Sequence, residues 1–282
     1  MRITRNIKQM FKLSQQARLK GKTIGFVPTM GSLHEGHLSL IRQARRENDV
    51  VAVSIFVNPT QFHPAEDFKR YPRDLRSDTR LCMKEGVDVI FYPHAKDMYP
   101  DDYKTYVIVE ELSDVLCGRF RAGHFKGVAT VVTKLFNIVS PDIAYFGQKD
   151  AQQAIIIKKM VCDLNIPVKI KVMPTVRQTD RLAMSSRNAY LKADERKEAT
   201  VLYQALNLAR DLIRQGNRNS LDIIRKMKQL INKKKNISVQ YVSIVDLEDL
   251  KPVARIKNKV LIALAVWMGK IRLIDNIIIE PK

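Results

Sequence analysis

In the first half of the chain, short β-branched runs alternate with longer segments whose apolar residues have helical spacing. The run at 50–57 is almost continuously apolar, which is typical of a strand buried on both faces. Shorter runs of this kind occur at 22–28, 88–92, 143–146 and 168–173. Helical spacing predicts helices over 35–47, 127–139 and 151–162. Strand–helix alternation of this kind predicts an α/β fold with a doubly wound parallel sheet.

The pattern changes near Asn188. Helical spacing runs from 193 to 235 with a break near Gly216 and Asn219. Three β-rich runs follow, at 238–245, 260–267 and 272–279. We therefore expect two domains: a doubly wound domain over residues 1–187 and a smaller α+β domain over residues 188–282.

The N-terminal segment is basic, with no acidic residue before Glu35. A transit peptide or a nucleic-acid-binding arm would have the same charge. Apolar side chains at 3, 7, 10, 11 and 17 nevertheless recur at helical spacing, and Gly21 is a plausible stop. We favour an amphipathic first helix of the fold.

Composition narrows the class of protein. The chain has 282 residues, 45% of them apolar, which is enough to build a core and excludes a disordered polymer. Its three Cys are too few and too scattered for a disulfide framework or a zinc knuckle, which suggests a reducing compartment. The longest apolar run, at 260–269, is about half of what a bilayer requires, so we expect no membrane partner.

The charge points to an anionic partner. Lys and Arg number 49 against 29 Asp and Glu, a net charge of +20. A nucleic-acid-binding module is one interpretation, but aromatic residues make up only 7% and the basic residues are spread over the whole chain. A phosphate-rich small substrate in a basic cleft explains the charge equally well, and we expect no nucleic acid.

The segment with the clearest chemistry, at 28–37, follows the first predicted strand and enters a helix. Ligands of doubly wound sheets bind at such turns, where backbone N–H groups attract phosphate. His34 and His37 are three residues apart, so both can face an anion bound there. There are three alternatives: the two histidines could bind a metal, they could be polar residues that only start the helix, and Gly31 and Gly36 could be simple turn glycines.

Three further polar segments are weaker when taken singly. Asn58 to Phe62 follow the buried strand, and their amides could bind a carboxylate, or the segment could be a plain Asn-Pro turn. Gly147 to Gln153 follow another strand and include Lys149, a cation suited to polyphosphate, although the segment could also be a glycine turn with an Asp helix cap. Met184 to Asn188 combine two hydroxyls with a guanidinium. The segment could be a phosphate clamp, or it could be a polar interdomain loop.

The order of these segments is more informative than any one of them. HxGH at 34–37 and MSSR at 184–187 resemble the paired signatures of class I aminoacyl-tRNA synthetases, which activate a carboxylate with ATP. A closer and collinear resemblance is to the pantoate–β-alanine ligase family. It rests on PTMG at 28–31, SIFVNPTQF at 54–62, YPR at 71–73, GHF at 123–125, FGQKD at 146–150, SSRN at 185–188 and RLIDN at 272–276.

This resemblance implies a cytoplasmic homodimer with a Rossmann-like catalytic domain and a small C-terminal lid domain. It implies the condensation of pantoate and β-alanine with ATP, through a pantoyl adenylate, to pantothenate, AMP and pyrophosphate. Mg²⁺ is the implied cofactor, and we assign no metal ligand. A nucleotidyltransferase that uses another acid or a phosphate ester is the related alternative.

The resemblance also implies residue roles. His34 and His37 would stabilise the transition state at the α-phosphate, and Lys149 would contact the terminal phosphates. The implied ATP-binding residues are Met30, Gly31, Ser32, Leu33, His34, Glu35, Gly36, His37, Gly147, Gln148, Lys149, Asp150, Val176, Met184, Ser185, Ser186 and Arg187. The implied residues for pantoate and β-alanine are Pro28, Thr29, Asn58, Gln61 and Gln153.

The sequence departs from the family pattern at two positions. Arg181 stands where the family usually has Gly, and Ala122 stands where Pro is common. If that Gly normally adopts a positive φ, Arg181 should force the loop to reshape, which would affect the placement of Val176 and of the lid. Ala122 should matter little, because Ala can adopt the conformation that Pro enforces.

Overall fold

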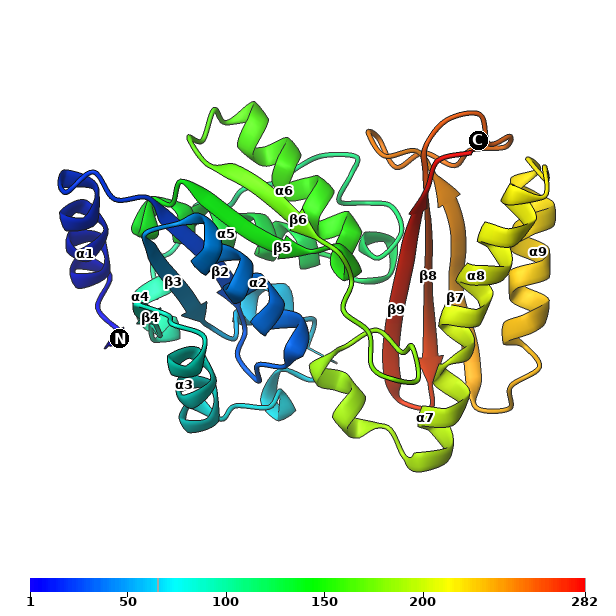
Figure 1. The fold of residues 1–282 in the computed structure, drawn as a ribbon, viewed down its shortest axis with the longest axis horizontal. Helices are drawn as coiled ribbons and strands as arrows, with labels where there is room; N and C mark the ends of the chain where they lie inside the picture. Colours follow the sequence, from blue (N-terminus) through cyan, green and yellow to red (C-terminus); the bar gives the residue numbers. More distant parts are fainter. Residues whose placement is uncertain (65, 282) are drawn as a thin grey trace. The chain divides into compact units, whose positions relative to one another are not determined.

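A computed structural model describes residues 1–64 and 66–281. The chain forms two compact units. The first contains residues 1–114, 118–148 and 152–174, and the second contains residues 115–117, 149–151 and 175–282. Figure 1 shows the order of their elements along the chain.

The first unit is built on a six-stranded sheet whose neighbouring strands are all parallel. The spatial order is β1-β4-β3-β2-β5-β6. The strands are β1 (Arg2–Thr4), β2 (Ile24–Thr29), β3 (Val50–Ile55), β4 (Val89–Phe91), β5 (Ile143–Gly147) and β6 (Lys169–Met173). The predicted doubly wound parallel sheet is confirmed.

Helices cover both faces of this sheet (Figure 1). They are α1 (Ile7–Leu19), α2 (Glu35–Glu47), α3 (Leu75–Lys84), α4 (Ala95–Met98), α5 (His124–Val139) and α6 (Ala151–Asp163). Val27 of β2 belongs to the same buried cluster as Ile41 of α2, whereas the preceding Phe26 packs its ring against Phe136 of α5. Because successive strand residues face opposite ways, α2 and α5 lie on opposite faces.

The first predicted helix begins later than its apolar spacing suggested. Ile3 lies in β1, which pairs in parallel with β4, and the helix begins at Ile7. Asn6 caps it by accepting a bond from the Gln9 backbone N–H at 3.0 Å. The prediction failed at Ile3 because the partner of β1 lies about ninety residues away in the chain, where helical periodicity carries no signal.

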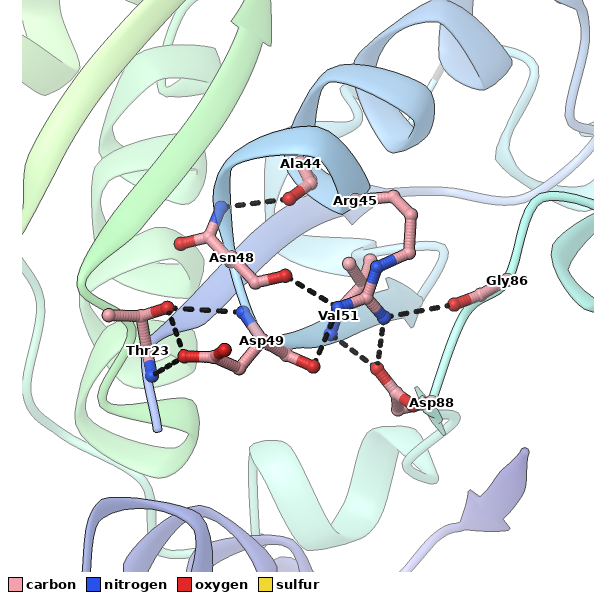
Figure 2. Close-up of polar contacts among 8 residues, drawn as sticks. All are labelled: Thr23, Ala44, Arg45, Asn48, Asp49, Val51, Gly86 and Asp88. Carbon is pink, nitrogen blue, oxygen red and sulfur yellow. Dashed lines mark hydrogen bonds and ion pairs between the residues drawn. The ribbon is translucent and has the colours of Figure 1, made fainter. Parts of the chain in front are cut away.

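A polar network ties the amino-terminal ends of β2, β3 and β4 together (Figure 2). The Arg45 guanidinium, at the end of α2, donates to Asp88 at 2.7 Å and to the carbonyls of Asn48 and Asp49. Asp88 also accepts the Val51 backbone N–H at 2.8 Å, and Asp49 accepts from Thr23. These bonds hold the strands at the edge of the sheet opposite to their carboxyl ends.

The second unit is an α+β fold, as predicted, with an antiparallel sheet in the order β7-β8-β9. Its strands are β7 (Ile237–Val245), β8 (Val260–Met268) and β9 (Ile271–Ile279). Its helices are α7 (Ala193–Ala199), α8 (Val201–Arg214) and α9 (Ser220–Ile231). Helices α8 and α9 pack on each other and on the sheet, and their buried faces form one apolar cluster with the strands. Of the two helices predicted here, the first is divided at Thr200.

In the described part of the chain, five short 3₁₀ helices connect these elements. They are η1 (Pro59–Gln61), η2 (Phe68–Arg70), η3 (Gly118–Phe120), η4 (Gln148–Asp150) and η5 (Ser186–Tyr190). Among the residues that the structure describes, none of the helices has the length and apolarity needed to span a membrane.

Candidate active site

The strand order of the first unit defines where a ligand should bind. From β2 the chain proceeds to β3 and β4 on one side, whereas β5 and β6 lie on the other side. The order therefore reverses between β2 and β5, and ligands of open α/β sheets bind at the carboxyl ends of the strands that flank such a point. Residues 30–37 follow β2, and Gly147 ends β5.

The turn after β2 is held by a buried carboxylate. Gly31 and Ser32 have positive φ angles of 82° and 52°, so the chain bends sharply there. The backbone N–H groups of Ser32 and Leu33 donate to the two oxygens of Asp78 at 2.9 and 2.8 Å. A Cβ at Gly31 would lie 2.9 Å from an Asp78 oxygen, so only glycine fits.

Asp78 was not among the predicted site residues. It lies in α3, a helix that the sequence analysis did not predict, and its exposure is 2%. Burial raises the pKa of this carboxyl, although its two backbone hydrogen bonds act in the opposite direction. A signal did exist: Asp78 shares a helical face with Leu75 and Cys82, and an acid on an apolar face needs buried partners.

His34 and His37 form the cap of α2. The Gly36 backbone N–H donates to Nδ1 of His34 at 3.1 Å, and the His34 backbone N–H donates to Nδ1 of His37 at 3.4 Å. The two rings stack with centroids 4.1 Å apart. Both histidines therefore cap the helix, which was the alternative interpretation, and this contact uses Nδ1 rather than Nε2, so capping is compatible with the proposed role of facing an anion.

Capping also fixes the protonation of the two rings. An Nδ1 atom that accepts a backbone N–H carries no proton, so each neutral ring carries its proton on Nε2. The stacked pair therefore offers two Nε2–H donors from one helix N-terminus, where the helix dipole also favours an anion. Such donors can stabilise charge that develops on phosphate oxygens.

The predicted substrate residues lie at the ends of β2 and β3. Asn58 donates through Nδ2 to Gln61 Oε1 at 3.0 Å and to the Gly127 carbonyl at 3.1 Å. The Gln61 amide nitrogen lies 3.3 Å from the sulfur of Met30. Asn58, Gln61 and Met30 are thus brought together, with the Gln61 amide group oriented by Asn58.

The remaining predicted residues of the first unit occupy neighbouring positions. Thr29 donates to the Ser54 carbonyl at 2.7 Å and accepts the Gly31 backbone N–H at 3.1 Å. Pro28 pairs with Ser54 in the sheet. Gln148 follows β5, and Gln153 lies half-buried in the first turn of α6.

A cavity of about 240 Å³ lies at the same edge of the sheet, on the side of β4. Of the predicted site residues, Met30 and Gly31 line it. Its wall also includes two guanidiniums, two carboxylates and an imidazole, from Arg5, Arg73, Asp74, Asp78 and His94. The cavity therefore borders the turn from the β4 side and is distinct from the switch point between β2 and β5.

The second unit contains the other predicted ATP-binding residues. Val176 and Met184 face each other across a hairpin, where the Met184 backbone N–H donates to the Val176 carbonyl at 3.0 Å. Ser185 caps η5, which contains Ser186 and Arg187, by accepting the Arg187 backbone N–H at 3.3 Å. Lys149 has its ammonium 3.5 Å from the carboxylate of Asp150.

Arg181 itself supplies the backbone conformation for which we expected the usual glycine to be needed. It adopts φ +73° itself, in the left-handed region that the usual glycine would favour. The turn closes with the Arg181 backbone N–H donating to the Gln178 carbonyl at 2.8 Å, and Arg177 bridges to Ala183. The arginine therefore accepts backbone strain while the Val176–Met184 pairing forms.

Two residues of β9 that were not among the predicted site residues organise these segments. Asp275 accepts a bidentate pair of bonds from Arg177 at 2.6 and 2.9 Å. Asn276 donates from Nδ2 to the Lys149 carbonyl at 2.8 Å. Both lie in the RLIDN segment, whose polar pair in a β-rich run was the available signal. Asp275 thus anchors the Arg177 side chain next to Val176, and Asn276 holds the backbone at Lys149.

The histidine pair belongs to the first unit and Lys149 to the second. Their meeting at one triphosphate stays a prediction. Within residues 1–64 and 66–281, no group of three or more His, Cys, Asp or Glu side chains is arranged to hold a metal ion.

Comparison with protein families gives one match over almost the whole chain. The family described as Pantoate-beta-alanine ligase matches residues 2–278. Pantothenate synthetase from Fervidobacterium nodosum is 58% identical over 99% of this chain and 100% of its own length. Pantothenate synthetase from Caldicellulosiruptor saccharolyticus is 56% identical over the same shares.

Solved structures give the same result. Pantothenate synthetase from Thermus thermophilus is similar with a TM-score of 0.93 at 43% identity, over 98% of this chain and 99% of that one. The pantoate-beta-alanine ligase of Francisella tularensis, complexed with Beta-gamma ATP and Beta-alanine, is similar with a TM-score of 0.81 at 38% identity. That similarity covers 100% of both chains.

Proposed function

Because the chain belongs to the pantoate–β-alanine ligase family, we propose that it condenses (R)-pantoate with β-alanine, using ATP, in the synthesis of pantothenate (vitamin B5), a precursor of coenzyme A. The products are pantothenate, AMP and pyrophosphate. The observation that carries this proposal is the family match over residues 2–278. The Francisella relative, complexed with Beta-gamma ATP and Beta-alanine, supports ATP and β-alanine as two of these substrates.

In the first step, a carboxylate oxygen of pantoate attacks the α-phosphorus of ATP. The bond from that phosphorus to the bridging oxygen breaks, and pyrophosphate leaves. The Nε2–H groups of His34 and His37 donate to the α-phosphate oxygens as charge develops on them, and Lys149 neutralises the terminal phosphates. Residues 30–37, Gly147, Gln148, Asp150, Val176 and 184–187 bind the nucleotide.

In the second step, the β-alanine amine attacks the acyl carbon of pantoyl adenylate. The acyl C–O bond breaks, the amine loses a proton, and AMP leaves with one oxygen of the former carboxylate. Gln61 and Gln153 hold pantoate, with Pro28, Thr29 and Asn58 around them, and Gln61 also borders the amine. No covalent enzyme intermediate is required, because two bound reactants gain from proximity alone.

Mg²⁺ fits this chemistry as a companion of the triphosphate. It prefers oxygen ligands and usually binds through phosphates, water and one or two carboxylates. The second unit offers Asp150 beside Lys149 as a carboxylate near the phosphate-binding residue. When bound, the ion would neutralise phosphate charge, which adds to the donors supplied by the two histidines.

We further propose a cytoplasmic homodimer in which residues 188–282 act as a lid domain. The first unit exposes apolar side chains on the segment before α5, where Tyr106 is 43% exposed and Ile108 is 59% exposed. Apolar exposure of this kind is consistent with a surface covered by a second copy of the chain.

Two assays test the proposed reaction. Purified protein should form AMP when ATP, pantoate and β-alanine are all present, and it should exchange labelled pyrophosphate into ATP with pantoate alone. A panel of other carboxylic acids serves as the control for the exchange. Exchange supported by another acid and not by pantoate would move the chain to a different adenylating reaction.

A further inference from the structure

Behind the predicted substrate residue Gln61 lies a chain of charged and polar groups from three segments of the first unit. Glu66 accepts two bonds from the Arg121 guanidinium, at 2.7 and 2.6 Å. The same guanidinium lies 2.8 Å from Nε2 of His124, and Nδ1 of His124 lies 2.8 Å from the Gln61 carbonyl oxygen. The chain ends on the backbone of Gln61.

The chemistry of these partners assigns the proton of His124. A guanidinium has no acceptor, so Nε2 of His124 accepts from Arg121 and carries no proton. A carbonyl oxygen has no donor, so Nδ1 carries the proton and donates to Gln61. His124 is therefore neutral with its proton on Nδ1, the opposite tautomer to that of His34 and His37.

The backbone that His124 contacts is already packed closely on the same helix. A Cβ added to Gly127 would lie 2.4 Å from the Thr60 carbonyl oxygen and 2.7 Å from Cα of Gln61. The Gly127 carbonyl accepts from Asn58, the residue that orients the Gln61 amide. The first turn of α5 thus contacts both residues: the Gly127 carbonyl accepts from Asn58, and His124 lies against the backbone of Gln61.

We propose that Arg121 and His124 are positioning residues for the acid substrate, and that they set the backbone of Gln61 through the Nδ1–H of His124. This inference rests on the proposed function, because it assigns pantoate to Gln61. We call the hydrogen-bonded series from Glu66 through Arg121 and His124 to the Gln61 carbonyl the relay. The Glu66–Arg121 ion pair holds it in place. The two side chains are 22% and 13% exposed, so the ion pair is shielded from water on most sides.

Two substitutions at His124 separate the two ends of the relay. His124→Asn places an amide N–H where Nδ1 was, so it can still donate to the Gln61 carbonyl. His124→Gln places its amide oxygen where Nε2 was, so it can accept from Arg121 but loses the donor near Gln61. The two variants differ in size by one methylene and carry the same functional group.

The steady-state KM for each substrate is the main measurement. His124→Gln should raise the KM for pantoate about tenfold, the loss expected for one hydrogen bond to a positioned group, and leave the KM for ATP within twofold. His124→Asn should keep the pantoate KM within about threefold of wild type. Equal KM changes for both substrates, or wild-type values for His124→Gln, would overturn the relay.

Nitrogen-15 NMR of the five histidines in the wild-type protein provides a readout that does not depend on the variants. The ring shifts of His124 should report protonation at Nδ1, whereas those of His34 and His37 should report protonation at Nε2. A His124 ring protonated at Nε2 would overturn the inference even if neither variant folds. Failure of the wild type to form pantothenate counts against the proposed function, whereas an active wild type with an Nε2-protonated His124 counts against the relay alone.

Discussion

At the residue scale, His37 has one structural role and one proposed catalytic role in the first turn of α2. Its Nδ1 caps the helix, and its Nε2–H is the donor assigned to the α-phosphate. His37→Ala should lower kcat about a hundredfold, the order expected for one lost oxyanion-type donor. His37→Gln is the matched control, because its amide nitrogen can replace Nε2–H, and it should retain more of the rate. Near wild-type turnover by His37→Ala would remove this residue from the catalytic step.

Arg181 stores backbone strain in an exposed turn. At its φ of +73°, a non-glycine residue destabilises the folded state by about 1–2 kcal/mol. Glycine would relieve this strain, but its greater conformational freedom in the unfolded chain would offset roughly 0.5–1 kcal/mol of the relief. Arg181→Gly should therefore stabilise the protein by about 1 kcal/mol or less and raise its melting temperature by about 2 °C. Arg181→Ala keeps the strain and removes the charge, so calorimetry should show no gain for it. An equal gain in both variants would identify charge repulsion as the cause.

Sequence reasoning proposed site residues that follow strands, and it missed the residues that support those segments. Residues 30–37, Asn58 and Gln61 were predicted because turns at strand ends concentrate ligand contacts. Asp78 and Asp275 act through bonds to residues 45 or more positions away, and local spacing does not reveal such partners. The strained conformation of Arg181 was also unpredictable, because sequence alone suggested that the loop would change instead.

At the element scale, the network around Arg45 should set the stability of the sheet without affecting the chemistry. Its guanidinium donates to Asp88 and to three carbonyls, a fork that a lysine ammonium cannot reproduce. Arg45→Lys should lower the free energy of unfolding by about 1–2 kcal/mol with kcat unchanged. Arg46→Lys, at the adjacent exposed position, is the control and should shift stability by less than about 0.5 kcal/mol. A loss of kcat in Arg45→Lys would show that this edge of the sheet is coupled to the site.

Strand β9 contacts a predicted ATP-binding residue, Lys149, through Asn276. Removal of its Nδ2 donor in Asn276→Ala releases the Lys149 carbonyl, so the KM for ATP should rise about tenfold. The KM for pantoate should stay within twofold, because the predicted pantoate residues lie in the first unit. Steady-state kinetics with each substrate varied in turn would check this. A rise confined to pantoate would contradict the assignment of Lys149 to ATP.

Element boundaries were predictable where one face of an element is apolar and its neighbours in sequence are also its neighbours in space. The predicted helix over 35–47 coincides with α2, which is flanked by the strands it packs on. Strand β1 and helix α3 were not predicted, for two different reasons. The pairing of β1 with β4 is remote in sequence, and the apolar face of α3 is interrupted by the buried Asp78.

At the scale of the whole molecule, acid stability depends in part on Glu47. It ends α2 and accepts bonds from Tyr145 of β5, Lys171 of β6 and Gln43. The Lys171 and Tyr145 bonds lower the pKa of Glu47 from 4.5 to about 2. Its contribution to stability is therefore present above pH 4.5 and is lost as the pH falls from 4.5 towards 2.

Glu47→Gln isolates that contribution. The variant should be less stable than wild type at pH 7 by about 2 kcal/mol, given a carboxylate that is 25% exposed. The difference should shrink below about pH 4, because the wild-type carboxylate is then becoming protonated. Denaturant melts at a series of pH values measure both. A constant difference between the two proteins from about pH 7 to about pH 3 would rule out this titration as the cause.

The proposed reaction requires the pantoate carboxylate to attack the α-phosphorus of ATP. Pantoate labelled with ¹⁸O in both carboxylate oxygens tests it most directly, with mass spectrometry of every product after one turnover. Attack at the α-phosphorus should place one ¹⁸O in AMP, one in the amide carbonyl of pantothenate and none in pyrophosphate. Label in inorganic phosphate with formation of ADP, or unlabelled AMP, would contradict it.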